Sequence, residues 1–405
     1  MSRYLATEGF YDINRIFEFQ ATGPYSATRV VFGCHSVDRV AEEADKYCSG
    51  NVLLITSKPH DELGVVDRIK TDLLAKGSNV FIFSNVEAEP SVATAEEIYT
   101  EYIEKNISLL IGFGGGSVMD ICKLLSPCFY GRHLPESIAR GQVIPHLRGV
   151  PFFLIPTTSG TGSEVTPFFV VSDVNGKLLQ NSPNYYPELT FVDPHVMVTM
   201  PPKLTAITGM DALSHAIEGM MNLKANPFSD MLCLGAVEFL GAFLRQAVKS
   251  GDDLEARFYV ALAATMAQLG MVMSGATYAH SVTYIIAKYK ETPHGLGCAL
   301  GLPYIMSYNA DAVTTKLASI AEALGGSIEA LSAKEAAKLS SALVKDLMQS
   351  IGLPVSLKEY GGITEDDLEE AGKLMIELYP RPMNPRPMSV AESIQFWQDM
   401  YDGCL

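Results

Sequence analysis

The chain is short of basic residues, with 30 lysines and arginines against 46 aspartates and glutamates, a net charge of −16 at pH 7. That charge repels the phosphates of nucleic acids and the headgroups of anionic membranes. No uninterrupted apolar run reaches the length of a membrane span, and no basic stretch followed by an apolar one resembles a signal peptide. We therefore expect a soluble protein that binds neither nucleic acid nor membrane.

Cysteines are also few, and no two of them form a CxxC pair. The seven are scattered, at positions 34, 48, 122, 128, 233, 298 and 404. An odd number of distant cysteines does not fit a disulfide framework and is typical of reduced thiols. We expect a cytoplasmic protein.

The pattern of apolar residues divides the 405-residue chain into two parts. The first half alternates strands, expected at 51–56, 79–83, 109–113 and 152–155, with helices, expected at 61–75 and 93–105. Such alternation predicts a parallel sheet with crossover helices. Residues 168–172 and 178–180 flank the turn-like DVNGK and predict a hairpin beside that sheet.

After Pro201 and Pro202 the pattern of apolar residues changes to long segments with helical periodicity. Helices are expected at 204–222, 227–247, 254–273 and 313–324. We place the boundary near Pro202, which gives an α/β domain over 1–202 and an all-helical domain over 203–405.

A glycine-rich turn follows one of the predicted strands, in LLIGFGGGSVMD at 109–120. Glycines let backbone N–H groups approach a diphosphate, and the following helix adds the positive end of its dipole. The turn can therefore cradle a dinucleotide. It is not the GxGxxG fingerprint, however, and a structural turn explains it about as well.

A polar loop, PTTSGTGSEVTP at 156–167, follows another predicted strand. Hydroxyl side chains and glycines gather at the place where an open α/β sheet binds ligands. The alternative is a solvated loop of turn formers, although the density of hydroxyl and glycine positions between two apolar strands is unusual.

Four potential metal ligands lie in the second half of the chain. Asp211 and His215 are four residues apart, so one helix face carries both side chains. The residues from His280 to His294 allow a helix segment and a turn that bring two more imidazoles to the same point. Mixed carboxylate and imidazole ligation suits Fe(II) or Zn(II). An isolated Asp/His pair of this kind is more often a solvated or capped helix face.

Taken together, these motifs resemble the iron-containing (group III) alcohol dehydrogenase family. The resemblance runs from about Arg29 to Ser389 and rests on motifs that occur in the family's order: GGGSVMD with Lys123, PTTSGTGSEVT, the DP at 193–194, GMDALSHAIEG, His280, the PHG at His294, and NPRPMS. It implies a Rossmann-like dinucleotide-binding domain, an all-helical metal-binding domain, and a metal in the cleft between them. An opening strand within 16–32, which pairs across a dimer, is also implied, and a homodimer or a larger homo-oligomer is the family's default.

The resemblance also implies an activity and a set of site residues. Fe(II) or Zn(II) makes an alcohol more acidic, and hydride passes between the alcohol carbon and NAD(P). The implied metal ligands are Asp211, His215, His280 and His294. The implied cofactor residues are Gly115, Gly116 and Ser117 at the pyrophosphate, Asp120 near the nicotinamide, Thr157, Thr158 and Thr161 along the groove, and Lys177 near the ribose. Lys177 has an equal alternative as a plain hairpin charge.

Three further residues bear on the chemistry. Ser57 stands where NAD-preferring members often carry an aspartate that repels a 2′-phosphate, so NADP should be tolerated. Tyr284 stands where many relatives carry a histidine that passes protons, which leaves the proton path open. Glu218 lies one turn after His215 and could orient it, but an exposed helix position is the expected role.

Substrate identity is less defined by the sequence. A short alcohol or aldehyde is the first expectation, with an aldehyde that bears a carboxylate, sulfonate or phosphonate kept open, because Arg381 could reach an anionic tail. Arg386, in the NPR motif, is expected to be structural. The alternatives are a hydroxyacid-oxoacid transhydrogenase and a non-catalytic metal- and nucleotide-binding protein. The related 3-dehydroquinate synthase and glycerol-1-phosphate dehydrogenase fit the intact PTTSGTGSEVT less well.

Overall fold

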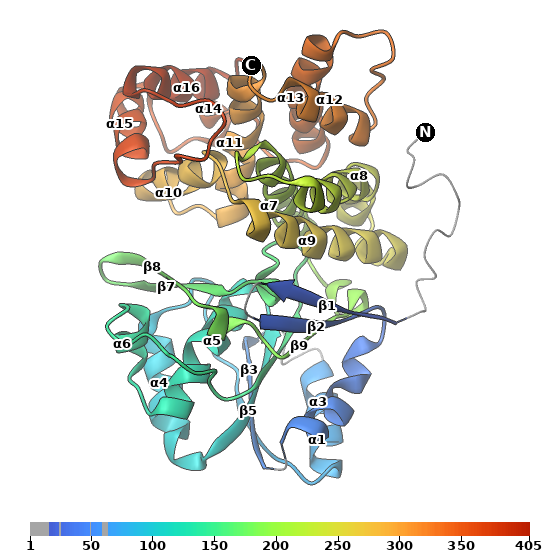
Figure 1. Cartoon of the computed structure of the whole chain (residues 1–405), viewed down its shortest axis with the longest axis vertical. Helices are drawn as coiled ribbons and strands as arrows, with labels where there is room; N and C mark the ends of the chain where they lie inside the picture. Colours follow the sequence, from blue (N-terminus) through green and yellow to red (C-terminus); the bar gives the residue numbers. More distant parts are fainter. Residues whose placement is uncertain (1–15, 24–25, 49, 59–63) are drawn as a thin grey trace. The chain divides into compact units, whose positions relative to one another are not determined.

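The structure is a computed structural model that describes residues 16–23, 26–48, 50–58 and 64–405. The described chain forms two compact units (Figure 1). An α/β unit takes in the chain as far as Thr158 together with 162–197, and a helical unit takes in 159–161 and 198–405. Each unit is described by itself.

A seven-stranded sheet forms the centre of the α/β unit. Its strand order is β1-β2-β9-β6-β5-β3-β4, and every neighbouring pair is parallel except β1 with β2. The strands are β1 Phe17–Gly23, β2 Ser26–Phe32, β3 Asn51–Thr56, β4 Asn79–Phe83, β5 Ile107–Gly114, β6 Phe152–Pro156 and β9 Leu189–Val192. The inner strands are apolar and almost fully buried, as expected for a parallel sheet covered on both faces.

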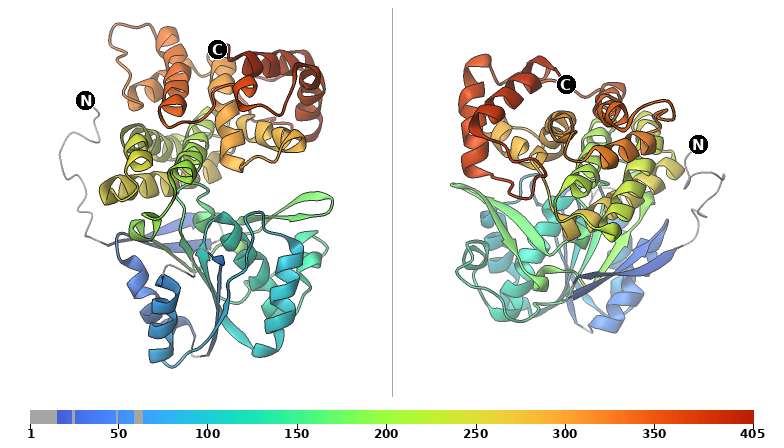
Figure 2. Two further views of the ribbon diagram at one scale, coloured as in Figure 1. Left: turned by 180° about the vertical axis from the view of Figure 1, so that it is seen from behind. Right: turned by 45° about the horizontal axis from the view of Figure 1, so that its top comes forward.

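Helices cover both faces of this sheet. Figures 1 and 2 show α1 and α3 on one face and α4, α5 and α6 on the other. Their bounds are α1 Val40–Tyr47, α3 Val65–Ala75, α4 Val92–Tyr102, α5 Gly116–Gly131 and α6 Pro135–Ala139. The side with α4, α5 and α6 holds a large apolar core that includes Ile98, Leu124 and Phe152. The predicted parallel sheet with crossover helices is confirmed.

Most predicted elements of this unit appear, with shifted ends. The helix expected at 61–75 is α3, which is described from Val65, and its expected first residues lie outside the described chain. The helix expected at 93–105 ends as α4 at Tyr102 and continues as a 3-10 turn, Ile103–Lys105. The segment 16–32 forms two antiparallel strands rather than one. The strand β9 was not predicted, because its four residues, LTFV, include a threonine and form no continuous apolar run like that at 152–155.

The predicted hairpin forms a small sheet of its own. Its strands are β7 Phe168–Asp173 and β8 Gly176–Asn181, paired antiparallel. Phe169 is fully buried and its ring meets Tyr185 edge-on at 4.9 Å between centroids, so the inner face of β7 packs into the core on α5.

The helical unit contains three long helices that follow one another along the chain: α7 Pro202–Met221, α8 Pro227–Lys249 and α9 Leu254–Ser274. They pack on one another (Figure 1). Within the described chain, α8 and α9 are long and apolar enough to cross a membrane by length and composition. However, 50% and 67% of their most apolar stretches are buried inside the protein, which is typical of core helices.

The remaining helices complete the unit. They are α10 Ala279–Tyr289, α11 His294–Asn309, α12 Thr314–Ala323, α13 Ala333–Ser350, α14 Leu357–Tyr360, α15 Leu368–Leu378 and α16 Val390–Asp402. Helix α11 packs on α7 and α10, which brings segments far apart in sequence together. The mostly helical second half is therefore confirmed. The division at Pro202 stays a prediction, and the two compact units part at Val198.

Candidate metal centre and nucleotide-binding turn

Helix α7 carries three ionisable side chains on one buried stretch. Asp211, His215 and Glu218 are spaced by four and three residues, so they share a helix face. All three are at least 96% buried, and the rest of the stretch from Thr205 to Met221 is apolar or small and buried too. A carboxylate buried in such a helix is costly unless a partner compensates for it. The partners come from α10 and α11.

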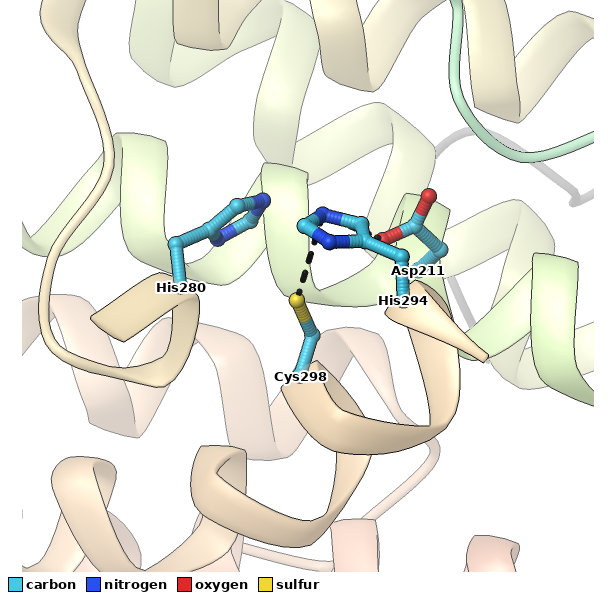
Figure 3. Close-up of side chains that lie close together, drawn as sticks. All are labelled: Asp211, His280, His294 and Cys298. Atoms are coloured by element: carbon cyan, nitrogen blue, oxygen red, sulfur yellow. Dashed lines mark hydrogen bonds and ion pairs between the residues drawn. The ribbon is translucent and has the colours of Figure 1, made fainter. Parts of the chain in front are cut away.

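Helices α10 and α11 each present a histidine from their first turn. His280 is the second residue of α10, and His294 opens α11 after Pro293. Cys298 follows one turn later on α11, so its thiol lies on the same side as the His294 ring. Figure 3 shows His280 and Asp211 approaching His294 from other helices, with Cys298 below it.

Four donor atoms from these elements lie together. One ligand atom each from Asp211, His280, His294 and Cys298 lies within 4.8 Å of the other three. His294 Nε2 is 3.9 Å from Asp211 Oδ1 and 3.6 Å from Cys298 Sγ. Three of the four predicted ligands are thus brought together, and Cys298 is an addition that the sequence reasoning missed. A cysteine four residues after a candidate ligand was the signal that could have found it.

The fourth predicted ligand, His215, lies beside this group. Its Nε2 is 3.7 Å from Asp211 Oδ1, and its ring stacks on that of His280 with 5.1 Å between centroids. Burial, reinforced by the charge that His280 can carry, lowers the pKa of His215 to about 3. The imidazole is therefore neutral at pH 7, which is the form that binds a metal.

The polar atoms of Asp211, His215, His280, His294 and Cys298 are of the types that bind a divalent cation. Asp211 Oδ1 and His215 Nδ1 are buried without a hydrogen bond. Burial raises the pKa of Asp211 despite the nearby His294 and His280 rings, because an isolated carboxylate is poorly solvated there. A carboxylate, imidazoles and a thiol are the donor set of Zn(II) and related ions. A cation among these donors would relieve the unpaired oxygen.

Glu218 is not the exposed helix residue that the sequence predicted. It is fully buried, and its Oε1 accepts hydrogen bonds from Thr277 N at 2.8 Å and from Thr277 Oγ1 at 2.7 Å. Its Oε2 contacts His280 Nδ1. Burial alone would raise the pKa of Glu218, but the charge of His280 and these hydrogen bonds lower it to about 2. With Nδ1 held by a carboxylate, His280 directs Nε2 toward the other donors. Glu218 thus orients His280, not His215.

Two more of the residues considered in the sequence, Arg381 and Tyr284, lie near the group. The Arg381 Nε donates to Ser281 Oγ at 2.9 Å, next to His280, and the guanidinium charge acts on Glu218 and Cys298. Tyr284 is stacked on Tyr379, 4.9 Å between centroids, and burial raises its pKa to about 12, so it stays a phenol at pH 7.

The expectation for Arg386 agrees with its contacts. It binds Glu392 at 2.7 Å and lies over the Tyr308 ring, 4.0 Å from the centroid, a structural pairing that ties α16 to α11.

In the α/β unit, the glycine-rich turn joins β5 to α5. A β-carbon on Gly114 would stand 2.4 Å from Val118 Cγ2, so only glycine lets the helix start this close to the strand. Gly115 is the extended N-cap, Gly116 begins the helix, and Ser117 donates its hydroxyl to the Ala88 carbonyl. The first N–H groups of α5 therefore lie at the carboxyl end of β5, available to an anion.

Asp120 and Lys123, from the same helix, are engaged within the unit. Asp120 accepts hydrogen bonds from Ser163 Oγ at 2.7 Å and from Val170 N at 2.9 Å. Lys123 Nζ is fully buried and donates to Ser163 Oγ, Thr166 Oγ1 and the Phe168 carbonyl at 2.6 to 2.8 Å. Burial lowers the pKa of Lys123 to about 8. This pair anchors the loop after β6 and strand β7 to α5.

The predicted cofactor residues come from separate motifs. These motifs follow the ends of three neighbouring strands. Within the sheet, Gly114 pairs with Pro156 and Thr56 with Phe113, so β3, β5 and β6 end side by side. Ser57 follows β3 directly. This is the edge at which open parallel sheets bind ligands.

The loop after β6 is shared between the two units. Thr157 donates its N–H to the Gly114 carbonyl at 3.0 Å, and Thr158 lies beside Gly115. Thr161 belongs to the helical unit, where the neighbouring Gly160 packs so closely on Thr208 of α7 that a β-carbon would stand 2.6 Å away.

Lys177 has a partner that the sequence did not reveal. On β8, its Nζ pairs with Glu89 at 3.1 Å, and both side chains are substantially exposed. The pairing is compatible with the plain hairpin charge that was one of the two expectations for this lysine.

Comparison with known proteins gives a consistent result. Residues 27–194 match the model of the iron-containing alcohol dehydrogenases, and 205–401 match the C-terminal model of the Fe-containing alcohol dehydrogenase family. The chain is 32% identical to a long-chain-alcohol dehydrogenase of Geobacillus thermodenitrificans over 94% of its length and 98% of the relative. It is 29% identical to the lactaldehyde reductase of Escherichia coli strain K12, over 90% of this chain and 96% of that one.

A solved structure of 1,3-propanediol oxidoreductase superposes with a TM-score of 0.86 at 29% identity, covering 92% of this chain and 97% of that one. The matched ranges together take in most of the chain and both of its units. The protein is an oxidoreductase that belongs to the iron-containing alcohol dehydrogenase family.

Proposed function

We propose that the protein interconverts a short-chain alcohol and its aldehyde by metal-dependent hydride transfer with NAD(P), and acts mainly as an aldehyde reductase. The observation that carries this proposal is Asp211 Oδ1, which is buried without a hydrogen bond. It lies 3.7 Å from His215 Nε2 and 3.9 Å from His294 Nε2, and His280 offers a further nitrogen close by. Such an arrangement is unfavourable without a cation. Among the described residues, the one group of three or more His, Cys, Asp or Glu side chains placed to hold a metal ion is Asp211, His280, His294 and Cys298.

These four residues would hold Fe(II) or Zn(II). When bound, such an ion acts as a Lewis acid toward an alcohol hydroxyl or an aldehyde carbonyl. Glu218 holds the tautomer of His280 through Nδ1, and the neutral His215 completes the set. Asp211 and His215 are buried among the apolar residues of α7, where electrostatic interactions are stronger than in water.

The cofactor would bind at the ends of β3, β5 and β6. There the N-terminus of α5, with Gly115, Gly116 and Ser117, receives the pyrophosphate. Asp120, Thr157, Thr158, Thr161 and Lys177 are proposed as further cofactor-binding residues. Asp120 would act chiefly by fixing the loop after β6, since both of its carboxylate oxygens already accept hydrogen bonds.

Ser57 would lie at the adenosine ribose. Because it carries no charge, we propose that NADP is accepted as well as NAD. Ser57→Asp should shift preference toward NAD, since a carboxylate repels the 2′-phosphate. The ratio of kcat/KM for NADPH and NADH measures this. An unchanged ratio places Ser57 away from the ribose.

The finer substrate proposal rests on Arg381. Its guanidinium lies beside His280 and acts electrostatically on Glu218 and Cys298. We propose that it receives the anionic group of a carboxylated, sulfonated or phosphonated aldehyde. Arg381→Ala should then raise KM for anionic aldehydes and leave KM for neutral ones nearly unchanged. Equal effects on both classes would reject an anionic substrate.

The metal proposal is tested by His280→Ala and His294→Ala, with the exposed His195→Ala as the matched control. Both variants of the donor group should lose metal and activity together while keeping nucleotide affinity, and the control should keep all three. Turnover without bound metal would overturn the proposal. Turnover without added NAD(P), in the presence of a hydroxyacid and an oxoacid, would identify a transhydrogenase instead. Metal and nucleotide binding without any turnover would identify a non-catalytic protein.

We also propose a homodimer or larger homo-oligomer in the cytoplasm. Light scattering coupled to size-exclusion chromatography measures the number of subunits. A monomer at micromolar concentration would reject the first part of this proposal.

A further inference from the structure

Cys298 is the one member of the donor group that the proposed function does not use. It is fully buried, and all seven cysteines of the chain are free thiols. It lies one helical turn after His294 on α11, so the two side chains project to the same side of the helix (Figure 3). The backbone of α11 therefore fixes the position of Cys298 relative to His294.

The distances around Cys298 fit coordination to a single ion. A tetrahedral ion with N at about 2.05 Å and S at about 2.3 Å holds these two donors roughly 3.5 Å apart. The separation of Cys298 Sγ from His294 Nε2 is 3.6 Å. The donors of Asp211 and His280 also lie within 4.8 Å of the sulfur. Four donors from three helices thus lie close enough together to hold one ion.

The other buried cysteine of the helical unit has different surroundings. Cys233 lies against Gly219 and Gly270, where α7, α8 and α9 pack closely, and it belongs to no described group of ligand-type side chains. A buried thiol in this unit is therefore not by itself a sign of metal binding. The distinguishing feature of Cys298 is the convergence of a carboxylate and two imidazoles on it.

We infer that Cys298 is a ligand of the metal ion, alongside Asp211, His280 and His294. The inference rests on the proposed function. On binding, the S–H bond breaks, a sulfur–metal bond forms and the proton passes to solvent, with no change of oxidation state. Because thiolate is a soft donor, it makes the site more selective for Zn(II) over Fe(II) than oxygen and nitrogen donors alone. Cys298 and His215 would then be alternative fourth ligands, so that one position on the ion stays open to the substrate oxygen.

Cobalt(II) substitution tests this inference by spectroscopy rather than by turnover. A thiolate bound to Co(II) gives an intense near-ultraviolet charge-transfer band, whereas carboxylate and imidazole ligands do not. The metal-stripped protein is titrated anaerobically with Co(II), and every variant carries Cys404→Ser so that the exposed thiol adds no signal. Cys298→Ala and Cys298→Ser are compared with Cys233→Ala as the matched control, and circular dichroism verifies folding.

We expect one Co(II) per chain and a charge-transfer band that the control keeps and both Cys298 variants lose. The affinity of Cys298→Ala for Zn(II) should fall at least about tenfold, and by a larger factor than its affinity for Fe(II). One bound Co(II) with its weak visible bands but no charge-transfer band, or a band that persists in Cys298→Ala, overturns the inference and leaves the proposed metal site intact. Failure to bind Co(II) at all overturns both.

Discussion

At the residue scale, the main feature of the candidate metal centre is a pair of buried carboxylates. Asp211 and Glu218 are carboxylates within an apolar helix, and each needs compensation. Glu218 obtains it from Thr277 and the His280 ring. Asp211 has an oxygen without a hydrogen bond, which a cation would satisfy. Because their partners differ, we propose different roles for the two carboxylates: Glu218 orients a ligand and Asp211 binds the ion.

Glu218→Gln should weaken metal binding by about 10- to 100-fold, because an amide holds the His280 tautomer less firmly than a carboxylate does. Competition with a chelator measures the dissociation constant. The matched control is Glu392→Gln, which alters an exposed carboxylate in the capping box of α16 of the same unit. Equal metal affinity in the Glu218 variant and the wild type would show that the contact with His280 has no positioning role.

The sequence predicted part of this centre. The spacing of Asp211 and His215 on one helix face was readable, since it follows a local rule. The helix that begins at His294 was not predicted. The role of Glu218 was not predicted either, because its partners come from 59 residues away along the chain. The pattern did hold a signal: Glu218 shares a face with Asp211 and His215 in a stretch that has no other ionisable residue after Lys203.

At the element scale, the junction of β5 and α5 determines how near a ligand can come to the helix N-terminus. Gly114 and Gly115 differ in the space that their surroundings leave for a side chain. A β-carbon on Gly114 would clash with Val118, whereas one on Gly115 would make only ordinary contact with Thr158, at 3.5 Å. The first glycine is therefore required for the packing of α5 on β5. We propose that the second leaves room for the pyrophosphate of the cofactor.

Gly114→Ala should lower the free energy of unfolding by about 1–3 kcal/mol, because α5 must move away from β5. Gly115→Ala should change stability by no more than about 0.5 kcal/mol but weaken nucleotide binding. Urea unfolding and a nucleotide fluorescence titration measure the two effects. The account is wrong if the two variants are equally stable, or if Gly115→Ala binds nucleotide as tightly as the wild type.

A buried amine also makes the stability of this element depend on pH. Burial lowers the pKa of Lys123 from 10.5 to about 8 in the folded protein. Between pH 8 and pH 10.5, Lys123 binds more protons in the unfolded chain than in the folded protein. The contribution of Lys123 to the free energy of unfolding therefore rises with pH in this range.

Lys123→Met should destabilise the protein by about 1–3 kcal/mol at pH 8, because Ser163, Thr166 and the Phe168 carbonyl lose a donor. The difference between wild type and variant should widen as the pH rises from 8 to 10. Chemical unfolding of both proteins at several pH values measures it, and the titration of the shared tyrosines cancels in the comparison. Parallel stability curves would show that Lys123 keeps its ordinary pKa.

At the scale of the whole molecule, the sequence predicted the two kinds of architecture better than their details. Alternating strands and helices and the later long helices are strong periodic signals, and both were confirmed. The short strand β9 was missed because a threonine interrupts its apolar residues. The placement of 159–161 with the helical unit was also unforeseen, since it depends on the close approach of Gly160 to Thr208.

The central claim is that a metal ion at the Asp211, His215, His280 and His294 group makes this chain an alcohol-aldehyde oxidoreductase. The most direct test is to titrate the metal-stripped protein anaerobically with Fe(II) or Zn(II) while following oxidation of NADH and NADPH by neutral and anionic short aldehydes. The account predicts no turnover without metal, and activity that rises in proportion to bound metal until one ion is bound per chain. Full activity in the metal-stripped protein, or bound metal without turnover of any aldehyde, would contradict it.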